Sequence, residues 1–259
     1  MKALILAAGR GTRLRKYTEG LPKGILPFQG KSLIERQLEV YSQCGISDIG
    51  IVTGYQAEKI QFPGIHYFHN PHFSETNMVE SLFCAEEFFC EGVIVSYADI
   101  LFEPRLLEGI VNAPIDIGVT VDLDWKRYWE ARYGSMDTDT ESLHFDDQGK
   151  ITSLGNSHPR LEEISARYVG LLKFTNEGIK ALKTVYRKSR KKYWGKPWKH
   201  APIFQKGYMT DLLQELIDEG HDVWAYKIRG GWLEFDTDGD FEIYQKWSTE
   251  GSLSRFISL

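Results

Sequence analysis

A glycine-rich loop directly follows the first strand-like run of the chain. Lys2–Leu6 is an apolar run of strand length, and the chain then reads AAGRGTRL, with glycines at positions 9 and 11. Paired glycines let backbone N–H groups approach phosphate oxygens, because no Cβ stands in the way. Arg13 and Lys23 add a planar guanidinium and a point charge near the same loop. The sequence therefore predicts a phosphate site just after the first strand.

Two familiar phosphate-binding loops do not fit this spacing. A dinucleotide fingerprint reads GxGxxG and runs straight into a helix, but Leu14 stands where the third glycine belongs. A P-loop reads GxxxxGK[ST], a pattern that the sequence lacks. The remaining structural alternative is a glycine turn with solvated charges, and the combination of Arg13 with Pro22-Lys23 argues against it.

Strand-like runs alternate with helical patterns through the first half of the chain. This alternation favours an α/β fold with a Rossmann-like, mostly parallel central sheet and helices on both faces. After the first strand, further strands are predicted at 48–53, 65–69, 92–97 and 115–121, and helices at 32–44, from Thr76 or Asn77 to about Phe89, and at 103–111.

The second half of the chain is less regular. The stretch from about 187 to 207 mixes Lys, Arg, Trp, Pro and Gly, which predicts a long functional loop. We expect one domain over 1–259, with a β-rich lobe inserted into it. The predicted elements are a hairpin over 143–154, strands at 167–174, 222–228 and 232–235, and helices at 176–186, 209–219 and 241–247.

Composition narrows the classes of function. The net charge of −5 argues against a non-specific nucleic-acid binder, which needs a basic face. No apolar run approaches the roughly 18–20 residues of a membrane span, and the N-terminal segment does not read as a signal peptide. Cys44, Cys84 and Cys90 form no CxxC pair, which suits a reducing compartment. We therefore expect a cytoplasmic protein without membrane insertion; a homodimer is compatible with the sequence.

The chain resembles nucleotidyltransferases of the sugar-phosphate type. LAAGRGTRL…PKG is similar to their GxGxRL…PK signature, and LPFQGKSLIERQLE and GISDIGIVTGY resemble the segments that follow it. Four shorter stretches resemble the phosphocholine and phosphonate cytidylyltransferase group: Gly54-Tyr55, TNMVESL at 76–82, YAD at 97–99 and GGWLEFDT at 230–237.

This resemblance implies a magnesium-dependent reaction. The enzyme would transfer CMP from CTP, or a nucleotide from another NTP, to a small phosphoryl or phosphonyl acceptor and release pyrophosphate. Phosphocholine, 2-aminoethylphosphonate and a phosphorylated amino acid are candidate acceptors. A sugar-1-phosphate nucleotidyltransferase is the alternative within the superfamily. A glycosyltransferase would use Asp122 and Asp124 as a DxD motif, and a non-catalytic nucleotide-binding regulator is the third rival.

The resemblance also implies roles for individual residues. As catalytic residues, Arg13 would hold the β- and γ-phosphates and Lys23 the α-phosphate and the acceptor. Asp99 and Asp236 would hold Mg²⁺, although each also reads as a helix cap. The nucleotide would lie against residues of the first strand, the glycine-rich loop and the 77–81 segment, where Asn77 has capping as its alternative: Leu6, Ala8, Gly9, Gly11, Thr12, Asn77 and Ser81.

The acceptor side is expected to involve Trp125, Arg132 and Tyr168. Aromatic rings cradle a quaternary ammonium by cation–π attraction in choline-type relatives, and Trp125 belongs to the aromatic segment 122–132. Core packing is an equal alternative for each ring in it. Arg132 and Arg167 could instead bind a phosphonate or carboxylate. By this reading the nucleotide-binding part covers about 1–121, the acceptor-side part about 122–230, and a closing metal-ligand segment about 231–259.

Overall fold

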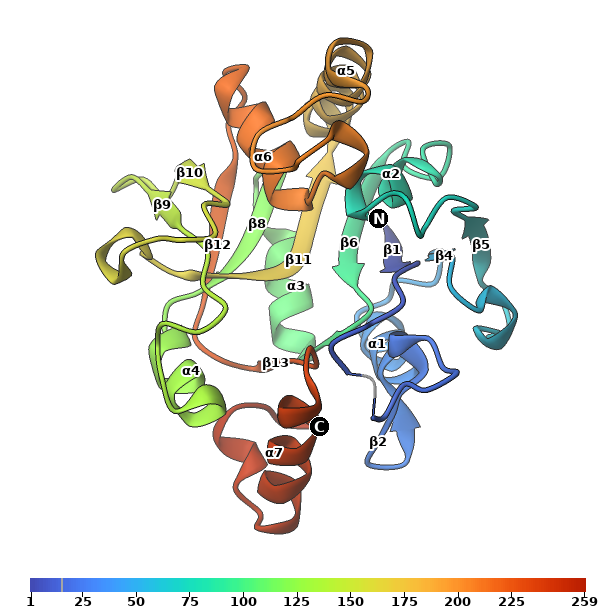
Figure 1. Ribbon diagram of the computed structural model, residues 1–259, viewed down its shortest axis with the longest axis vertical. Coiled ribbons are helices and arrows are strands. Elements are labelled where there is room, and N and C mark those ends of the chain that lie inside the picture. Colours follow the sequence, from blue (N-terminus) through green and yellow to red (C-terminus); the bar gives the residue numbers. More distant parts are fainter. Residues whose placement is uncertain (15) are drawn as a thin grey trace.

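A mixed sheet of seven strands forms the centre of the molecule, which we describe from a computed structural model (Figure 1). Across the sheet the strands are β12 (Trp224–Ile228), β8 (Ile117–Asp122), β11 (Arg167–Thr175), β6 (Gly92–Tyr97), β1 (Lys2–Ala7), β4 (Ile49–Thr53) and β5 (His66–His69). β11 is antiparallel to both its neighbours, and the other neighbouring strands pair in parallel. The predicted mostly parallel α/β sheet is confirmed. The structure describes residues 1–14 and 16–259.

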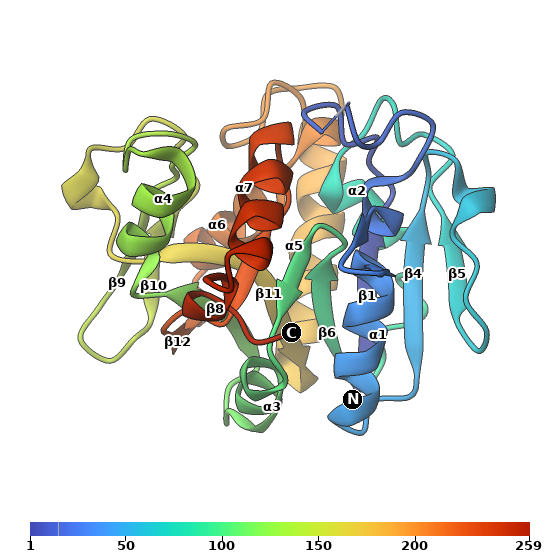
Figure 2. The ribbon, with the colours of Figure 1, turned by 90° about the horizontal axis from the view of Figure 1, so that it is seen from below.

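Helices cover both faces of this sheet and produce three layers (Figure 2). Successive side chains of a strand point to opposite faces, so a strand between two helical layers is apolar throughout. Ala3 and Ile5 of β1 lie in one core cluster, and Leu4 and Leu6 lie in the other. The first cluster is covered by α1 (Leu33–Gln43), α3 (Pro104–Asn112) and α7 (Asp238–Thr249), and the second by α2 (Met78–Phe83), α5 (Asn176–Tyr193) and α6 (Met209–Asp218).

The prediction of a long loop from 187 to 207 is wrong for the first part of that range. Helix α5 continues to Tyr193, and its inner face buries Val185, Tyr186 and Ser189. The basic residues of this stretch lie on the solvent side and in the last turn, where positive charge is favourable next to the helix C-terminus. The run of Lys and Arg led to the prediction of a loop, although residues at helical spacing in α5 pack against the core.

Helix α4 (Trp125–Tyr133) was not predicted. Its buried face consists of Trp125, Tyr128, Trp129 and Arg132, which do not form the aliphatic stripe usually read as an amphipathic helix. The predicted hairpin is present as β9 (Leu143–Phe145) and β10 (Ile151–Leu154). The part from 122 to 230 thus supplies this small sheet, three helices, and strands β11 and β12 of the central sheet.

A short strand pairing brings the segment after Gly231 to the end of β6. β13 (Trp232–Glu234) pairs antiparallel with β7 (Ile100–Phe102), directly after β6. Thr237 then caps helix α7, and its side chain accepts a hydrogen bond from the backbone of Asp240.

The remaining small sheet joins β2 (Pro27–Phe28) and β3 (Lys31–Ser32). α2 ends at Phe83 rather than near Phe89, and the chain continues in turns. Within the described residues, no helix has the length and apolarity that a membrane span requires.

Candidate active site

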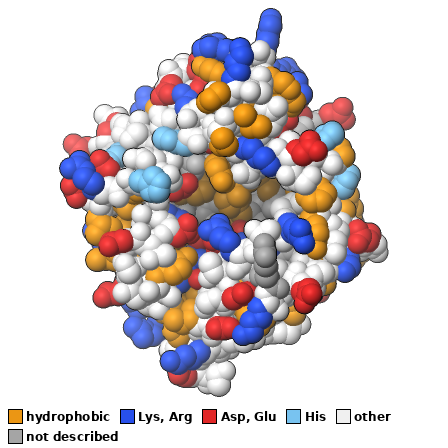
Figure 3. All heavy atoms as spheres, viewed as in Figure 1, with side chains coloured by type: hydrophobic (Ala, Val, Ile, Leu, Met, Phe, Trp, Pro, Cys, Tyr) orange, Lys and Arg blue, Asp and Glu red, His pale blue; other side chains and the backbone are white. Residues whose placement is uncertain are grey.

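One open cavity of about 300 Å³ lies at the carboxyl ends of β1 and β6. Figure 3 shows the hollow near the centre of the face, bordered by basic and acidic side chains. Ligands of open α/β sheets bind at this edge. All residues predicted for the catalytic, nucleotide and metal sites line this cavity: Leu6, Ala8, Gly9, Gly11, Thr12, Arg13, Lys23, Asn77, Ser81, Asp99 and Asp236.

The glycine-rich loop turns tightly between β1 and Lys23. Gly11 has a φ of +66°, and a Cβ built on it would lie 3.0 Å from the Cβ of Lys23. A larger residue would therefore be strained and would push Lys23 away from the cavity. The fully buried Leu14 anchors the far end of the turn, and its N–H donates to the Gly11 carbonyl. The loop geometry thus follows from the two residue types found at positions 11 and 14.

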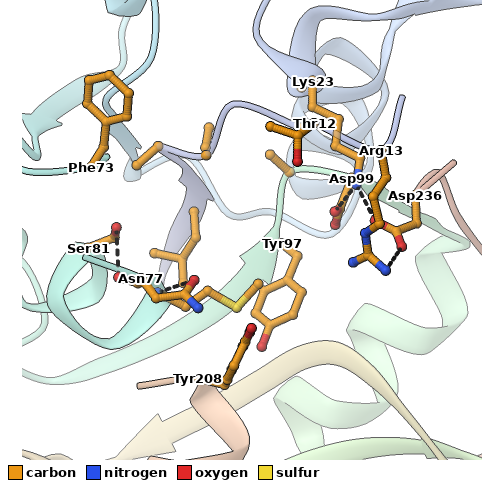
Figure 4. Close-up of a pocket in the computed structure, with 18 of the residues that line it drawn as sticks. Thr12, Arg13, Lys23, Phe73, Asn77, Ser81, Tyr97, Asp99, Tyr208 and Asp236 are labelled. Carbon is orange, nitrogen blue, oxygen red and sulfur yellow. Dashed lines mark hydrogen bonds and ion pairs between the residues drawn. The ribbon is translucent and has the colours of Figure 1, made fainter. Parts of the chain in front are cut away.

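Lys23 joins the two carboxylates that were predicted to hold a metal. Its Nζ lies 2.7 Å from Asp99 Oδ2 and 2.9 Å from Asp236 Oδ1 (Figure 4). Burial alone would lower the pKa of Lys23, but Asp99 and Asp236 raise it above its ordinary value. Burial raises the pKa of Asp99, against the effect of Lys23. The cluster is therefore an ion triad that is largely withdrawn from solvent.

Backbone pairing explains how residues so far apart in sequence meet. The N–H of Phe235 donates to the carbonyl of Asp99 at 2.8 Å, which extends the β13–β7 pairing to the end of β6. Asp236 follows immediately, and its own N–H donates to Asp240 Oδ2. The start of α7 also touches the glycine-rich loop, because the N–H of Asp238 donates to the Arg13 carbonyl at 3.3 Å. No local sequence pattern specifies these contacts.

Arg13 extends the triad toward solvent. Its Nη1 lies 2.7 Å from Asp236 Oδ2 and 3.6 Å from Asp139 Oδ1. Its side chain keeps 62% of its surface exposed, so the guanidinium remains accessible to a ligand at the cavity mouth. Two cations and two carboxylates therefore converge at one end of the cavity, which suits a site where anionic oxygens and a divalent cation meet.

Asn77 and Ser81 form the opposite end of the cavity, on the first turn of α2 (Figure 4). Asn77 Oδ1 accepts the N–H of Met78, so the capping alternative describes this side chain as the structure shows it. Ser81 is buried and donates to the Asn77 carbonyl, and its hydroxyl also accepts from Asn70 Nδ2 at 2.9 Å. Both polar groups are therefore held in place by the protein itself.

Other residues line the cavity although the sequence did not single them out. Tyr97 ends β6, and its hydroxyl lies 2.9 Å from that of Tyr168 on β11. Tyr208 precedes α6 and is 48% exposed, and Phe73 lines the cavity on the same side of Figure 4 as Ser81. Tyr97 was detectable as a strand-end residue. Tyr208 carried no signal, because only the fold brings the start of α6 to this edge.

The three residues predicted for the acceptor site do not line this cavity. Trp125 is 1% exposed and packs edge-on against Trp129 in the core, so we do not retain it as an acceptor residue. The Arg132 side chain is fully enclosed and binds Asp240 and Glu234. Neither residue lines the cavity. Tyr168 reaches it only through the hydroxyl of Tyr97. The open aromatic face expected on the 122–132 segment is therefore a packed helix.

The rival DxD motif serves a structural purpose. Asp122 is fully buried, and its carboxylate accepts hydrogen bonds from Trp232 Nε1 at 2.9 Å and from the N–H of Gly230 at 3.0 Å. Asp124 pairs with Arg229 at the surface. Both residues line a second, smaller cavity away from the Lys23 triad. The DxD motif would have favoured a glycosyltransferase, but its Asp122 instead connects the end of β8 to the start of β13.

The fold and the Lys23 triad together define an α/β protein with an ion triad beside a glycine-rich loop, at the ends of β1 and β6. Comparison with known proteins agrees: the model of the MobA-like NTP transferase domain matches residues 3–134. The chain belongs to this family.

Two curated relatives and one solved structure are similar to this chain. CTP:phosphoglutamine cytidylyltransferase of Campylobacter jejuni is 31% identical over 256 residues, which cover 94% of this chain and 98% of the relative. Choline-phosphate cytidylyltransferase of Streptococcus pneumoniae is 36% identical over 107 residues, 40% of this chain and 47% of the relative. The fold matches a structure of CTP:phosphocholine cytidylyltransferase from S. pneumoniae with a TM-score of 0.74 and 22% identity, over 95% of this chain and 97% of that one.

Proposed function

We propose that this protein is a cytidylyltransferase that moves CMP from CTP to a small phosphate or phosphonate acceptor. The observation that carries the proposal is the Lys23–Asp99–Asp236 triad beside the glycine-rich loop. A relative that spans nearly the whole chain is named for the same reaction class, with phosphoglutamine as its acceptor. Phosphocholine, 2-aminoethylphosphonate and phosphorylated amino acids are the acceptor classes under consideration.

The proposed reaction is a single displacement. An oxygen of the acceptor phosphate or phosphonate attacks the α-phosphorus of CTP, the bond from that phosphorus to the bridging oxygen breaks, and pyrophosphate leaves. The protein must align two anions and neutralise the charge that grows between them. Lys23 would contact the α-phosphate and the attacking oxygen. Arg13, at the cavity mouth, would hold the β- and γ-phosphates.

Magnesium fits the residues present. Mg²⁺ prefers oxygen ligands and is commonly held by one or two carboxylates together with substrate phosphates. Asp99 and Asp236 both pair with Lys23, and Asp99 Oδ1 is buried with no hydrogen-bond partner in residues 1–14 and 16–259. These two carboxylates would hold the ion, which would neutralise the triphosphate. The described residues contain no cluster of three His, Cys, Asp or Glu side chains, so the remaining ligands would come from nucleotide and water.

We further propose a division of labour along the chain. Residues of about 1–121 would bind the nucleotide through the loop after β1 and the first turn of α2. The part of about 122–230 would bind the acceptor, and the segment of about 231–259 would close the site by bringing Asp236 to Asp99. The hydrogen bond from Phe235 to Asp99 supports the last of these roles.

The test is a pyrophosphate-release assay with Mg²⁺. Each of the four ribonucleoside triphosphates and dTTP is combined with separate pools of phosphocholine, phosphonates, phosphorylated amino acids and sugar-1-phosphates. Release with CTP and a non-sugar acceptor is expected. Release only with UTP or dTTP and a sugar-1-phosphate would replace the proposal by the alternative, a sugar-1-phosphate nucleotidyltransferase. The Lys23→Met variant, prepared in parallel, controls for contaminating activity.

A further inference from the structure

Arg167 on β11 is a buried cation whose hydrogen-bonding capacity is not used. Its side chain is 9% exposed, and among the described residues neither Nε nor Nη1 has a hydrogen-bond partner. The Nη2 atom has only a long ion pair, 3.9 Å from Asp139 Oδ2. The guanidinium carbon lies 4.5 Å from the Trp129 ring centroid, but a guanidinium withdrawn from water with so few hydrogen bonds is unfavourable, and proteins keep such groups where a function needs them. The unused donors indicate that a group from outside the chain completes this site.

Arg132 packs against the ring of Trp129, as Arg167 does, but each of its three guanidinium nitrogens has a hydrogen-bond partner. Its Nε and Nη2 bind the two oxygens of Asp240 at 2.6 and 2.7 Å, and its Nη1 binds Glu234 at 2.8 Å. Arg132 therefore has a structural role and offers nothing to a ligand. Arg167 is the arginine of this pair that retains free donors.

Two contacts connect Arg167 to the catalytic end of the cavity. Asp139 stands between Arg167 and Arg13, 3.9 Å from the first and 3.6 Å from the second. The next residue on β11, Tyr168, touches Tyr97, which lies between the Asn77 and Asp236 ends of the cavity (Figure 4). Nε and Nη1 are enclosed in the structure, so binding of a ligand to them would require the segment around Asp139 to shift. The long ion pair is the link that such a shift would break.

The charges around Arg167 favour a ligand that is itself a zwitterion. Within the part of the chain that the structure describes, Glu141 forms no ion pair. There, Asp139 has only its two long ion pairs, with Arg13 and Arg167. Arg132 already compensates Glu234. One free guanidinium thus faces two loosely held carboxylates, which matches a carboxylate and an ammonium on one molecule.

The same geometry disfavours a quaternary ammonium without a carboxylate. Such a cation is recognised by the open faces of aromatic rings. Trp129 is fully buried, and the Arg167 and Arg132 guanidinium carbons lie 4.5 and 5.1 Å from its ring centroid. At Trp129 the protein's own arginines therefore occupy the position that a choline headgroup would need, whereas Phe73, Tyr97 and Tyr208 are rings that line the main cavity.

We propose that Arg167, together with Asp139 and Glu141, forms the acceptor subsite and selects a phosphorylated or phosphonylated α-amino acid. Arg167 binds the carboxylate of the acceptor, and the two acids bind its ammonium. The proposal rests on the cytidylyltransferase function proposed above. It makes Arg167 the residue that determines acceptor class, whereas Lys23 and Arg13 serve the phosphates.

The first experiment uses acceptor pairs that differ only by the carboxylate. O-phosphoserine is compared with phosphoethanolamine, and 2-amino-3-phosphonopropionate with 2-aminoethylphosphonate; homologues longer by one or two methylenes cover the reach of the subsite. We expect kcat/KM to be on the order of 10²-fold higher for the carboxylate-bearing member of the best pair. Equal or better use of the decarboxylated member, or of phosphocholine, overturns the proposal while the cytidylyltransferase function stands. No pyrophosphate release with any acceptor and any nucleotide contradicts the proposed function itself.

The second experiment tests whether Arg167 carries this preference. Arg167→Met should reduce the preference for the carboxylate-bearing acceptor to within about threefold, chiefly by raising KM for that acceptor. Arg127→Met is the matched control, since Arg127 is an exposed arginine of α4 that lines the other cavity. The circular dichroism spectrum and the urea midpoint, compared with those of the wild type, show whether the variant is folded. A preference that survives in Arg167→Met assigns the carboxylate to another residue and overturns the proposal.

Discussion

The nucleotide and acceptor sides of the cavity are built in different ways. The proposed nucleotide side consists of a tight loop after β1 and the first turn of α2, where short-range hydrogen bonds hold the backbone. The proposed acceptor side is surrounded by charged side chains from distant segments, where Arg132 binds Asp240 across 108 positions and Arg167 lies near Asp139. On the first side local conformation shapes the site, and on the second long-range ion pairs do. Variants on the two sides should therefore differ in whether they mainly lower transfer activity or the free energy of unfolding.

The largest effect is expected at the junction of the two sides, from Lys23→Met. Loss of the ammonium removes the cation that would stabilise the α-phosphate and leaves Asp99 and Asp236 uncompensated. We expect kcat/KM for transfer to fall by on the order of 10³-fold or more, measured by pyrophosphate release. Lys31→Met is the control, because Lys31 is an exposed lysine paired with Glu39. A decrease below tenfold would show that Lys23 is not part of the reaction.

The next effect distinguishes the two arginines of the acceptor side. Arg132→Met leaves Asp240, 1% exposed, and Glu234 without their cation, and should lower the free energy of unfolding by about 3–5 kcal/mol. Arg167→Met removes a guanidinium that has few partners, and should lower it by less than about 1 kcal/mol. Urea denaturation followed by circular dichroism measures both values. Equal losses would mean that Arg167 is a structural residue like Arg132.

A pH-dependent effect follows from Glu234 on the acceptor side. Burial raises the pKa of this carboxyl, but Arg132 and Arg167 lower it, and the result is a pKa of about 2 against an ordinary value of 4.5. Because the folded-state pKa is the lower one, Glu234 stabilises the fold above pH 4.5, and this stabilisation is lost as the pH falls toward 2.

Comparison with Glu234→Gln measures this contribution. The difference in unfolding free energy between the wild type and the variant should be on the order of 2–3 kcal/mol at pH 7 and should shrink steadily below pH 4.5. Denaturant titrations at several pH values provide the curve. A difference that does not change with pH would remove Glu234 from the ion-pair network.

The smallest effect is expected on the nucleotide side, from Ser81→Ala. The hydroxyl of Ser81 is already bonded to Asn70 and to the Asn77 carbonyl, so its loss loosens the first turn of α2 without uncovering a charge. We expect KM for CTP to rise about fivefold, with kcat unchanged within a factor of two. Ser42→Ala on the exposed face of α1 is the control. A large decrease in kcat would place Ser81 near the reacting phosphates instead.

Several features of the fold were predictable because their signals are local. β1 is apolar at every position after Lys2, since both of its faces are covered, and the loop that follows needs glycine at position 11 for a φ of +66°. The residues predicted to share a nucleotide and metal site do line one cavity. The missed α4 and the extended α5 show the limit of the same reasoning. There, aromatic or basic residues at helical spacing packed against partners that the sequence does not reveal.

The sequence by itself determined the α/β fold, the turn after the first strand and the set of residues suited to phosphates. These depend on residue size, backbone freedom and hydrophobic period over a few positions. Only the tertiary structure decided which charges meet: Lys23 with Asp236, 213 positions away, and Arg132 rather than Arg167 with Asp240. The physical reason is that a buried charge is stable only with a partner, and the choice of partner depends on how strands and helices from distant parts of the chain pack together.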